Sequence, residues 1–304
     1  MPEHLFSEIS QAVFHTLLYS DVFDYPLTAS EVHRYLTQIS ATYEDVWEVL
    51  NENPQFIKRG DYFALTGRES IVPIRARRTR RSQELLPYAI RYGRVLGCLP
   101  FVRMVTLTGS LAVMNISQNA DFDYMLVTSP GRLWTARAFV LLFGRCTKIR
   151  GHTICPNLIV STDSLEWHRH DLYSARELCQ MIPITGKDVY QKLMQANAWI
   201  RDVLPNAYQI SNISETSPGF LRRFLEFPLL GKPGDRLERW EMNRKIARFA
   251  KQEGFGDETV FNTQMCQGNF DHHRHWTEEA FRQRRRRFRE HLLPAEEGIR
   301  VTGR

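Results

Sequence analysis

Two short polar motifs, each beside a predicted strand, place the strongest constraint on how this chain folds. Residues 102–108 form a short apolar run rich in β-branched side chains, which predicts a buried strand that ends at Gly109. The second motif, Asp121-Phe122-Asp123, leads directly into the apolar residues 124–127, which predict a neighbouring strand. The sequence therefore predicts a turn and a pair of carboxylates on adjacent elements.

The chemistry of these two motifs favours a triphosphate and a divalent cation. Gly109 lacks a β-carbon, so its backbone can approach a bulky anion, and the free N–H groups of a helix starting there would point at that anion. Ser110 adds a hydroxyl donor. Side chains alternate along a strand, so Asp121 and Asp123 project from the same face. Their mutual repulsion is relieved by a cation, and Mg²⁺, or Mn²⁺ in its place, suits carboxylates and phosphates.

The spacing resembles the signature of the DNA polymerase beta-like nucleotidyltransferase superfamily. That signature is a hydrophobic residue, Gly and Ser, then a gap of about ten residues, then Asp-hydrophobic-Asp-hydrophobic, which Gly109, Ser110, Asp121 and Asp123 match. Residues 107–112 with Asn115, and 127–134, are similar to bacterial nucleotidyltransferase-domain proteins. The resemblance implies that Gly109 and Ser110 bind an NTP and that Asp121 and Asp123 are catalytic metal ligands.

The family pattern also has a third carboxylate on a later strand, and here the sequence departs from it. The next predicted strand covers residues 152–160, and its expected inward polar residue is Asn157, whose amide cannot act as a base. Asp163 follows near the strand end and would substitute only in a shifted register. A turn or helix-capping role for Asp163 is the alternative. Nucleotide binding is thus better supported than catalysis.

Four segments are expected, giving an α/β (α+β) fold. Residues 1–68 form three helices and a hairpin, an order that resembles a winged helix, although its third helix carries acidic side chains that oppose DNA binding. Residues 69–98 form a basic linker helix that contains Pro87. Residues 99–165 form a small mixed-sheet nucleotidyltransferase core, and residues 166–304 form a C-terminal helical region.

Positive charge is concentrated in two arginine runs. The formal net charge is +6, yet the runs 75–81 and 282–289 alone supply eleven positive charges. Both runs are candidate nucleic-acid contacts, with solvated helix faces as the alternative. Lys148 and Arg150, just before the third strand, are candidate triphosphate contacts, with surface solvation again the alternative.

Composition limits the remaining functional classes. The chain is 43% hydrophobic and 24% charged, and its longest apolar run is too short to cross a membrane, so we expect no membrane association. The N-terminus lacks a secretory signal, and the five cysteines have no Cys-x-x-Cys pair, so we expect a cytoplasmic protein with reduced thiols. The favoured function is Mg²⁺-dependent transfer of a nucleotidyl group from an NTP to an unknown acceptor, which is a nucleic acid, a protein or a small molecule. The alternative is a catalytically weak or inactive fold that acts as a nucleotide sensor or nucleic-acid-binding regulator.

Overall fold

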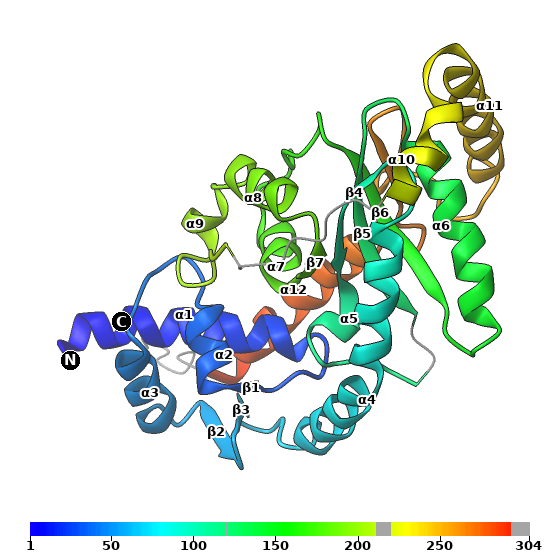
Figure 1. The fold of residues 1–304 in the computed structure, drawn as a ribbon. Coiled ribbons are helices and arrows are strands. Elements are labelled where there is room, and N and C mark those ends of the chain that lie inside the picture. Colours follow the sequence, from blue (N-terminus) through cyan, green and yellow to red (C-terminus); the bar gives the residue numbers. More distant parts are fainter. Residues whose placement is uncertain (119–120, 211–219, 293–304) are drawn as a thin grey trace, which may run out of the picture.

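The computed structural model describes residues 1–118, 121–210 and 220–292, and it centres on a mixed sheet with helices on both faces (Figure 1). The strand order is β7-β4-β5-β6-β9-β8, and among the described pairs only β5 and β6 run parallel. The protein is therefore of the α+β class that the sequence predicts. The strands are β4 (Val102–Leu107), β5 (Phe122–Thr128), β6 (Ile154–Ser161), β7 (Ile182–Thr185), β8 (Thr259–Phe261) and β9 (Met265–Gly268).

The alternation of side chains along the central strands produces two apolar faces. Tyr124 and Leu126 of β5 belong to one buried cluster, whereas Met125 and Val127 belong to the other. Asp123 follows the second alternation and so lies on the face of Met125. The first face packs against α4 (Ile71–Gly97), α6 (Leu133–Lys148) and α11 (Gly231–Phe249); the second packs against α7 (Leu172–Gln180), α8 (Lys187–Ala196) and α9 (Ile200–Val203).

The N-terminal residues enclose an apolar core of their own. The antiparallel sheet of this N-terminal module has the order β1-β3-β2, and its helices enclose a separate buried cluster. Thr28 and Thr42 each begin a helix with a reciprocal capping box. The elements are α1 (Glu3–Asp21), β1 (Leu27–Thr28), α2 (Ala29–Arg34), α3 (Tyr43–Glu52), β2 (Phe56–Arg59) and β3 (Tyr62–Leu65).

Helix α4 covers most of the segment predicted as a basic linker helix and contains Pro87 within its length. The last helix, α12 (His273–Leu292), returns to the N-terminal module and packs along α1. Phe281 meets the ring of Tyr19 with centroids 5.8 Å apart, and Arg284 pairs with the buried Asp21 at 2.7 Å. The two ends of the described chain thus form one packed unit.

The region after residue 165 differs from the helical region that we expected. It contributes β7, β8 and β9 to the central sheet, in addition to the helices α7 to α12, of which α10 covers Phe220–Glu226, and the short 3₁₀ helix η1 (Phe227–Leu229). These strands are three or four residues long, so they carry little local signal. Pairing with β4 and β6 stabilises them instead. Within the described ranges, no helix has the length and apolarity needed to cross a membrane.

Candidate functional site

A cleft of about 600 Å³ lies where the central sheet, the N-terminal module, α7 and α12 meet. The four residues that match the family signature line it together: Gly109, Ser110, Asp121 and Asp123. Strand β4 brings the Gly-Ser turn to this point, and the antiparallel neighbour β5 brings the carboxylates. The structure therefore places the two predicted motifs in one cavity.

Gly109 and Asp123 pack directly against each other. The backbone N–H of Thr108 donates to the carbonyl oxygen of Asp123 at 2.9 Å, and Gly109 adopts a φ of +66°. A β-carbon at Gly109 would lie 3.1 Å from the Cβ and Cγ atoms of Asp123 and closer still to its carboxylate. The following helix α5 (Gly109–Ala112) has one turn, so Gly109 serves mainly to allow this close approach.

Hydrogen bonds from two other segments hold the Gly-Ser turn. The N–H of Asn115 donates to the carbonyl oxygen of Ser110 at 2.8 Å. The Asn115 side chain donates to the carbonyl oxygen of Phe23 at 3.3 Å and accepts from Arg78 at 3.2 Å. The N-terminal module and α4 therefore fix the position of the turn.

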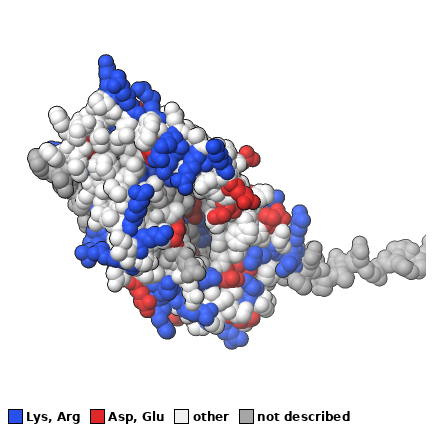
Figure 2. Space-filling model, turned by 90° about the vertical axis from the view of Figure 1, so that its right-hand side faces the viewer, with Lys and Arg blue, Asp and Glu red and all other residues white. Residues whose placement is uncertain are grey.

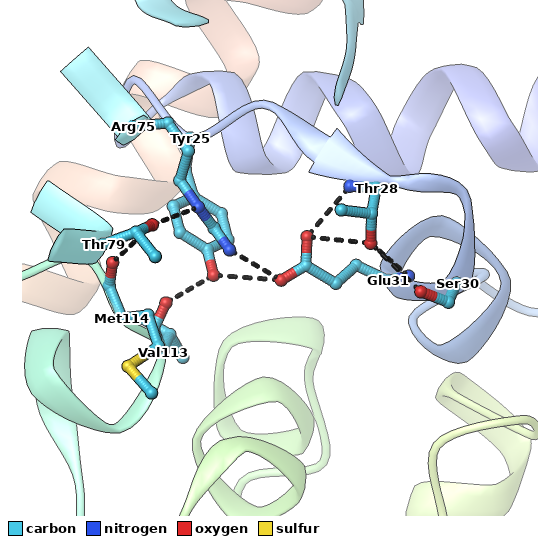
Figure 3. Close-up of polar contacts among 8 residues, drawn as sticks. All are labelled: Tyr25, Thr28, Ser30, Glu31, Arg75, Thr79, Val113 and Met114. Atoms are coloured by element: carbon cyan, nitrogen blue, oxygen red, sulfur yellow. Dashed lines mark hydrogen bonds and ion pairs between the residues drawn. The ribbon is translucent and has the colours of Figure 1, made fainter. Parts of the chain in front are cut away.

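A second polar network joins the N-terminal module to the residues after α5 (Figure 3). The guanidinium of Arg75 lies 3.7 Å from the ring centroid of Tyr25 and pairs with Glu31 at 2.8 Å. The Tyr25 hydroxyl donates to the carbonyl oxygen of Val113, and Thr79 donates to that of Met114 at 3.4 Å. Tyr25 also lines the cleft, so the module is part of the cavity wall.

The carboxyl groups of the cleft interact electrostatically. Burial, with the charge of Asp121 as a second cause, raises the pKa of Asp123 to about 7, although a hydrogen bond with the Cys155 thiol acts in the opposite direction. Burial and, to a smaller extent, the Asp123 charge together raise the pKa of Glu177 to about 7. Such closely placed acids favour either a shared proton or a bound cation.

The two residues considered for the third carboxylate position, Asn157 and Asp163, lie in different places. Asn157 lines the cleft, whereas Asp163 is exposed in the turn after β6. The residue paired with Asp123 on β6 is Cys155, because the register shifts between Asp123 and Met125. No sequence pattern indicated this irregularity. Lys148 and Arg150, the predicted triphosphate contacts, are exposed at and after the end of α6 and do not line the cleft.

Sequence reasoning missed the contribution of α7. Tyr173, Arg176, Glu177 and Gln180 all line the cleft. Their spacing of three, four and seven residues places them on one side of the helix. In the sequence, this polar stripe beside an apolar one was the signal that could have indicated a polar helix face at the site. Helix α7 therefore supplies both a carboxylate and a guanidinium.

A second missed contribution comes from the segment between β9 and α12. Gly268, Asn269, Asp271 and His273 line the cleft together with residues of the N-terminal module. Across the described ranges, no cluster of three or more His, Cys, Asp or Glu side chains has the arrangement of a metal site.

The arginine runs are partly engaged within the chain. Arg75, Arg78 and Arg81 make intramolecular hydrogen bonds, as does Arg284 with Asp21. The side chain of Arg289 lies outside the described part. On the face shown in Figure 2, Lys and Arg side chains are interspersed with Asp and Glu. Fewer arginines are thus free for phosphate contact than the sequence suggests.

Comparison with protein-family models, with curated proteins and with solved structures found no significant match for this chain.

Proposed function

We propose that this protein is a Mg²⁺-dependent nucleotidyltransferase that binds an NTP in the cleft. The observation that carries the proposal is the packing of Gly109 against Asp123, because it brings the phosphate-type turn and the carboxylate pair into one cavity. In this proposal Gly109 and Ser110 contact the triphosphate, and Asp121 and Asp123 are the catalytic carboxylates. The winged-helix-like N-terminal module would form one wall of the substrate site.

The residues present fit a magnesium ion. Mg²⁺ is usually held by one or two carboxylates together with substrate phosphates, so the pair Asp121 and Asp123 is a sufficient protein ligand set. Burial and the charge of Asp121 disfavour the charged form of Asp123 and so raise its pKa. A bound cation would counter both effects, because it stabilises the carboxylate. When bound, the ion would neutralise charge on the phosphoryl oxygens.

A specific observation supports the second candidate, a nucleotide sensor with little or no turnover. The β6 residues that line the cleft with the carboxylate pair are Cys155 and Asn157, and neither supplies a carboxylate. Burial raises the pKa of Cys155 to about 12, with the Asp123 charge as a further cause, so its thiol stays protonated near neutral pH and cannot accept a proton from the acceptor hydroxyl. Glu177 is the cleft carboxyl that we assign to activation of an acceptor hydroxyl if turnover occurs.

Calorimetry and a transfer assay test the proposal. ATP, GTP, CTP and UTP are titrated with and without Mg²⁺ into the wild type and into Asp121→Asn, Asp123→Asn and the control Asp163→Asn. We expect metal-dependent binding of at least one NTP, lost in the first two variants and retained in the third. If none of the four nucleotides binds in the presence of Mg²⁺, the proposal is wrong.

Transfer of label from an α-labelled NTP then separates enzyme from sensor. Turnover that disappears in Glu177→Gln, with NTP affinity retained, supports an enzyme that uses the α7 carboxylate. Binding without turnover supports the sensor. Asn157→Asp should raise turnover if the position of Asn157 corresponds to the missing third carboxylate, by up to roughly 10²–10⁴-fold.

A further inference from the structure

Arg176, on the cleft side of α7, is a buried cation that forms no ion pair with any described residue. Its side chain is almost fully buried at 2% exposure, and it lines the same cleft as Asp121 and Asp123. Its Nε and Nη2 atoms are buried and have no hydrogen-bond partner among the described residues. A guanidinium stays protonated in proteins, so this arrangement leaves hydrogen-bond donors and a positive charge without partners there.

Two tyrosine rings of the N-terminal module hold this guanidinium. Its carbon lies 4.4 Å from the ring centroid of Tyr35 and 5.1 Å from that of Tyr19. Ring faces stabilise the cation but accept few of its hydrogen bonds. Burial lowers the pKa of Arg176, whereas the nearby Tyr19 and Glu31 raise it.

Arg75 provides a contrast within the same chain. It is also buried and also lies over a tyrosine ring, but it pairs with Glu31 at 2.8 Å and donates to Thr79 at 3.1 Å. Those contacts give Arg75 a structural role between α4 and the N-terminal module. One nitrogen of Arg75, Nη1, is also buried without a hydrogen-bond partner, but within the described ranges Arg176 has neither an ion pair nor a side-chain hydrogen bond, and it lines the cleft.

We infer that Arg176 forms an anion subsite for a phosphate group of the ligand, with its guanidinium held in place by Tyr19 and Tyr35. The planar guanidinium donates in a fork that matches phosphate oxygens. The cleft would then have two unlike parts: a carboxylate part at Asp121 and Asp123 and a cationic part at Arg176. This inference rests on the proposed function and refines it, because it makes the N-terminal module a support for ligand binding.

The test uses inorganic phosphate and pyrophosphate as probes, without metal and at constant ionic strength. Affinity is measured by calorimetry and by the ligand-dependent rise in Tm for the full chain. We expect Arg176→Met to weaken phosphate binding by about tenfold or more, as for loss of a charge-assisted hydrogen bond. Arg176→Lys should weaken it less, because it keeps the charge. Tyr35→Leu should also weaken it, because the guanidinium loses its support.

The control is Arg91→Met, which removes an exposed arginine of α4 that does not line the cleft. It should leave phosphate affinity unchanged. Equal phosphate affinity in the wild type, Arg176→Met and Arg176→Lys would overturn the inference. If Arg176→Met fails to fold, the comparison of the wild type with Arg176→Lys and Tyr35→Leu decides it, since an anion subsite requires that both lose affinity.

A second titration identifies the source of the phosphate group. If pyrophosphate competes with Mg²⁺·NTP, Arg176 contacts the triphosphate; if both bind together, Arg176 contacts a phosphate group of the acceptor. Arg176-dependent phosphate binding in a protein that binds no NTP would uphold the subsite and reject the nucleotidyltransferase proposal. The two proposals therefore fail separately.

Discussion

The carboxylate of Asp123 lies against the α-carbon of Gly109, so that any β-carbon at residue 109 would overlap it. This contact joins β5 to the turn after β4. Two physical reasons therefore require glycine at this turn: residue 109 has a positive φ, and there is no room for a side chain.

Gly109→Ala should lower both stability and metal-dependent NTP affinity. The matched control is Gly131→Ala, because Gly131 also has a positive φ, +64°, but a β-carbon there would meet no atom within 4 Å. Both variants incur the left-handed backbone strain of about 1–2 kcal/mol. Chemical denaturation should show a larger loss for Gly109→Ala, and calorimetry should show lost NTP binding for that variant alone. Equal effects in both variants would contradict the contact.

The pH dependence of stability should report the buried carboxyl of Asp123. Its pKa in the folded protein, about 7, lies above the ordinary value of 3.8, so the folded state favours the protonated form. In the metal-free protein this contribution is complete below the ordinary pKa and is lost as pH rises from about 4 to about 7. Asp123→Asn should therefore be more stable than the wild type above pH 7, by on the order of 1 kcal/mol or more, with the difference vanishing near pH 4.

Urea denaturation of both proteins between pH 4 and 8, with Asp163→Asn as the exposed control, measures this difference. A large loss of stability in Asp123→Asn at pH 8 would mean that the carboxylate has a structural role instead.

Glu238 should be important for the stability of α6. Its carboxylate accepts from the backbone N–H groups of Trp134 and Thr135, both at 2.8 Å, and from the Thr135 hydroxyl at 2.6 Å. It thereby caps a helix whose own N-terminal residue provides no side-chain cap. Glu238→Ala leaves these buried donors unsatisfied, so we expect a loss of about 1–3 kcal/mol in denaturation experiments. The exposed Glu84→Ala on α4 should change stability by much less.

Nucleic-acid binding, if it occurs, should depend on the exposed arginines of α12. Replacing three of them with Gln should weaken the binding measured by gel shift. It should also reduce the slope of log K against log salt by the amount expected for the loss of roughly one to three phosphate contacts. We expect weak, sequence-independent binding by the wild type. Binding that is insensitive to salt, or unaffected by the triple replacement, would assign this run to solvated helix surface. The replaced residues are Arg285, Arg286 and Arg287, and the control set is Arg91, Arg94 and Arg145.

The sequence by itself determined the local features of this protein. Strand β4 with its Gly109 turn, the shared face of Asp121 and Asp123, the caps at Thr28 and Thr42, and helix α4 all follow from alternation, capping and propensity, which act between residues close in the chain. These features fix the carboxylate half of the candidate site.

Only the tertiary structure decided the other half of the site. The register shift between β5 and β6 places Cys155 beside Asp123, and strands β7 to β9 form because long-range pairing stabilises segments with weak local signals. Arg176 and Glu177 enter the cleft because α7 packs on the sheet face of Met125, and Arg176 is held by rings from the N-terminal module, which lies far earlier in the chain. The sequence pattern of α7 indicates only that its polar side chains share one side of a helix; what that side meets depends on how distant elements pack.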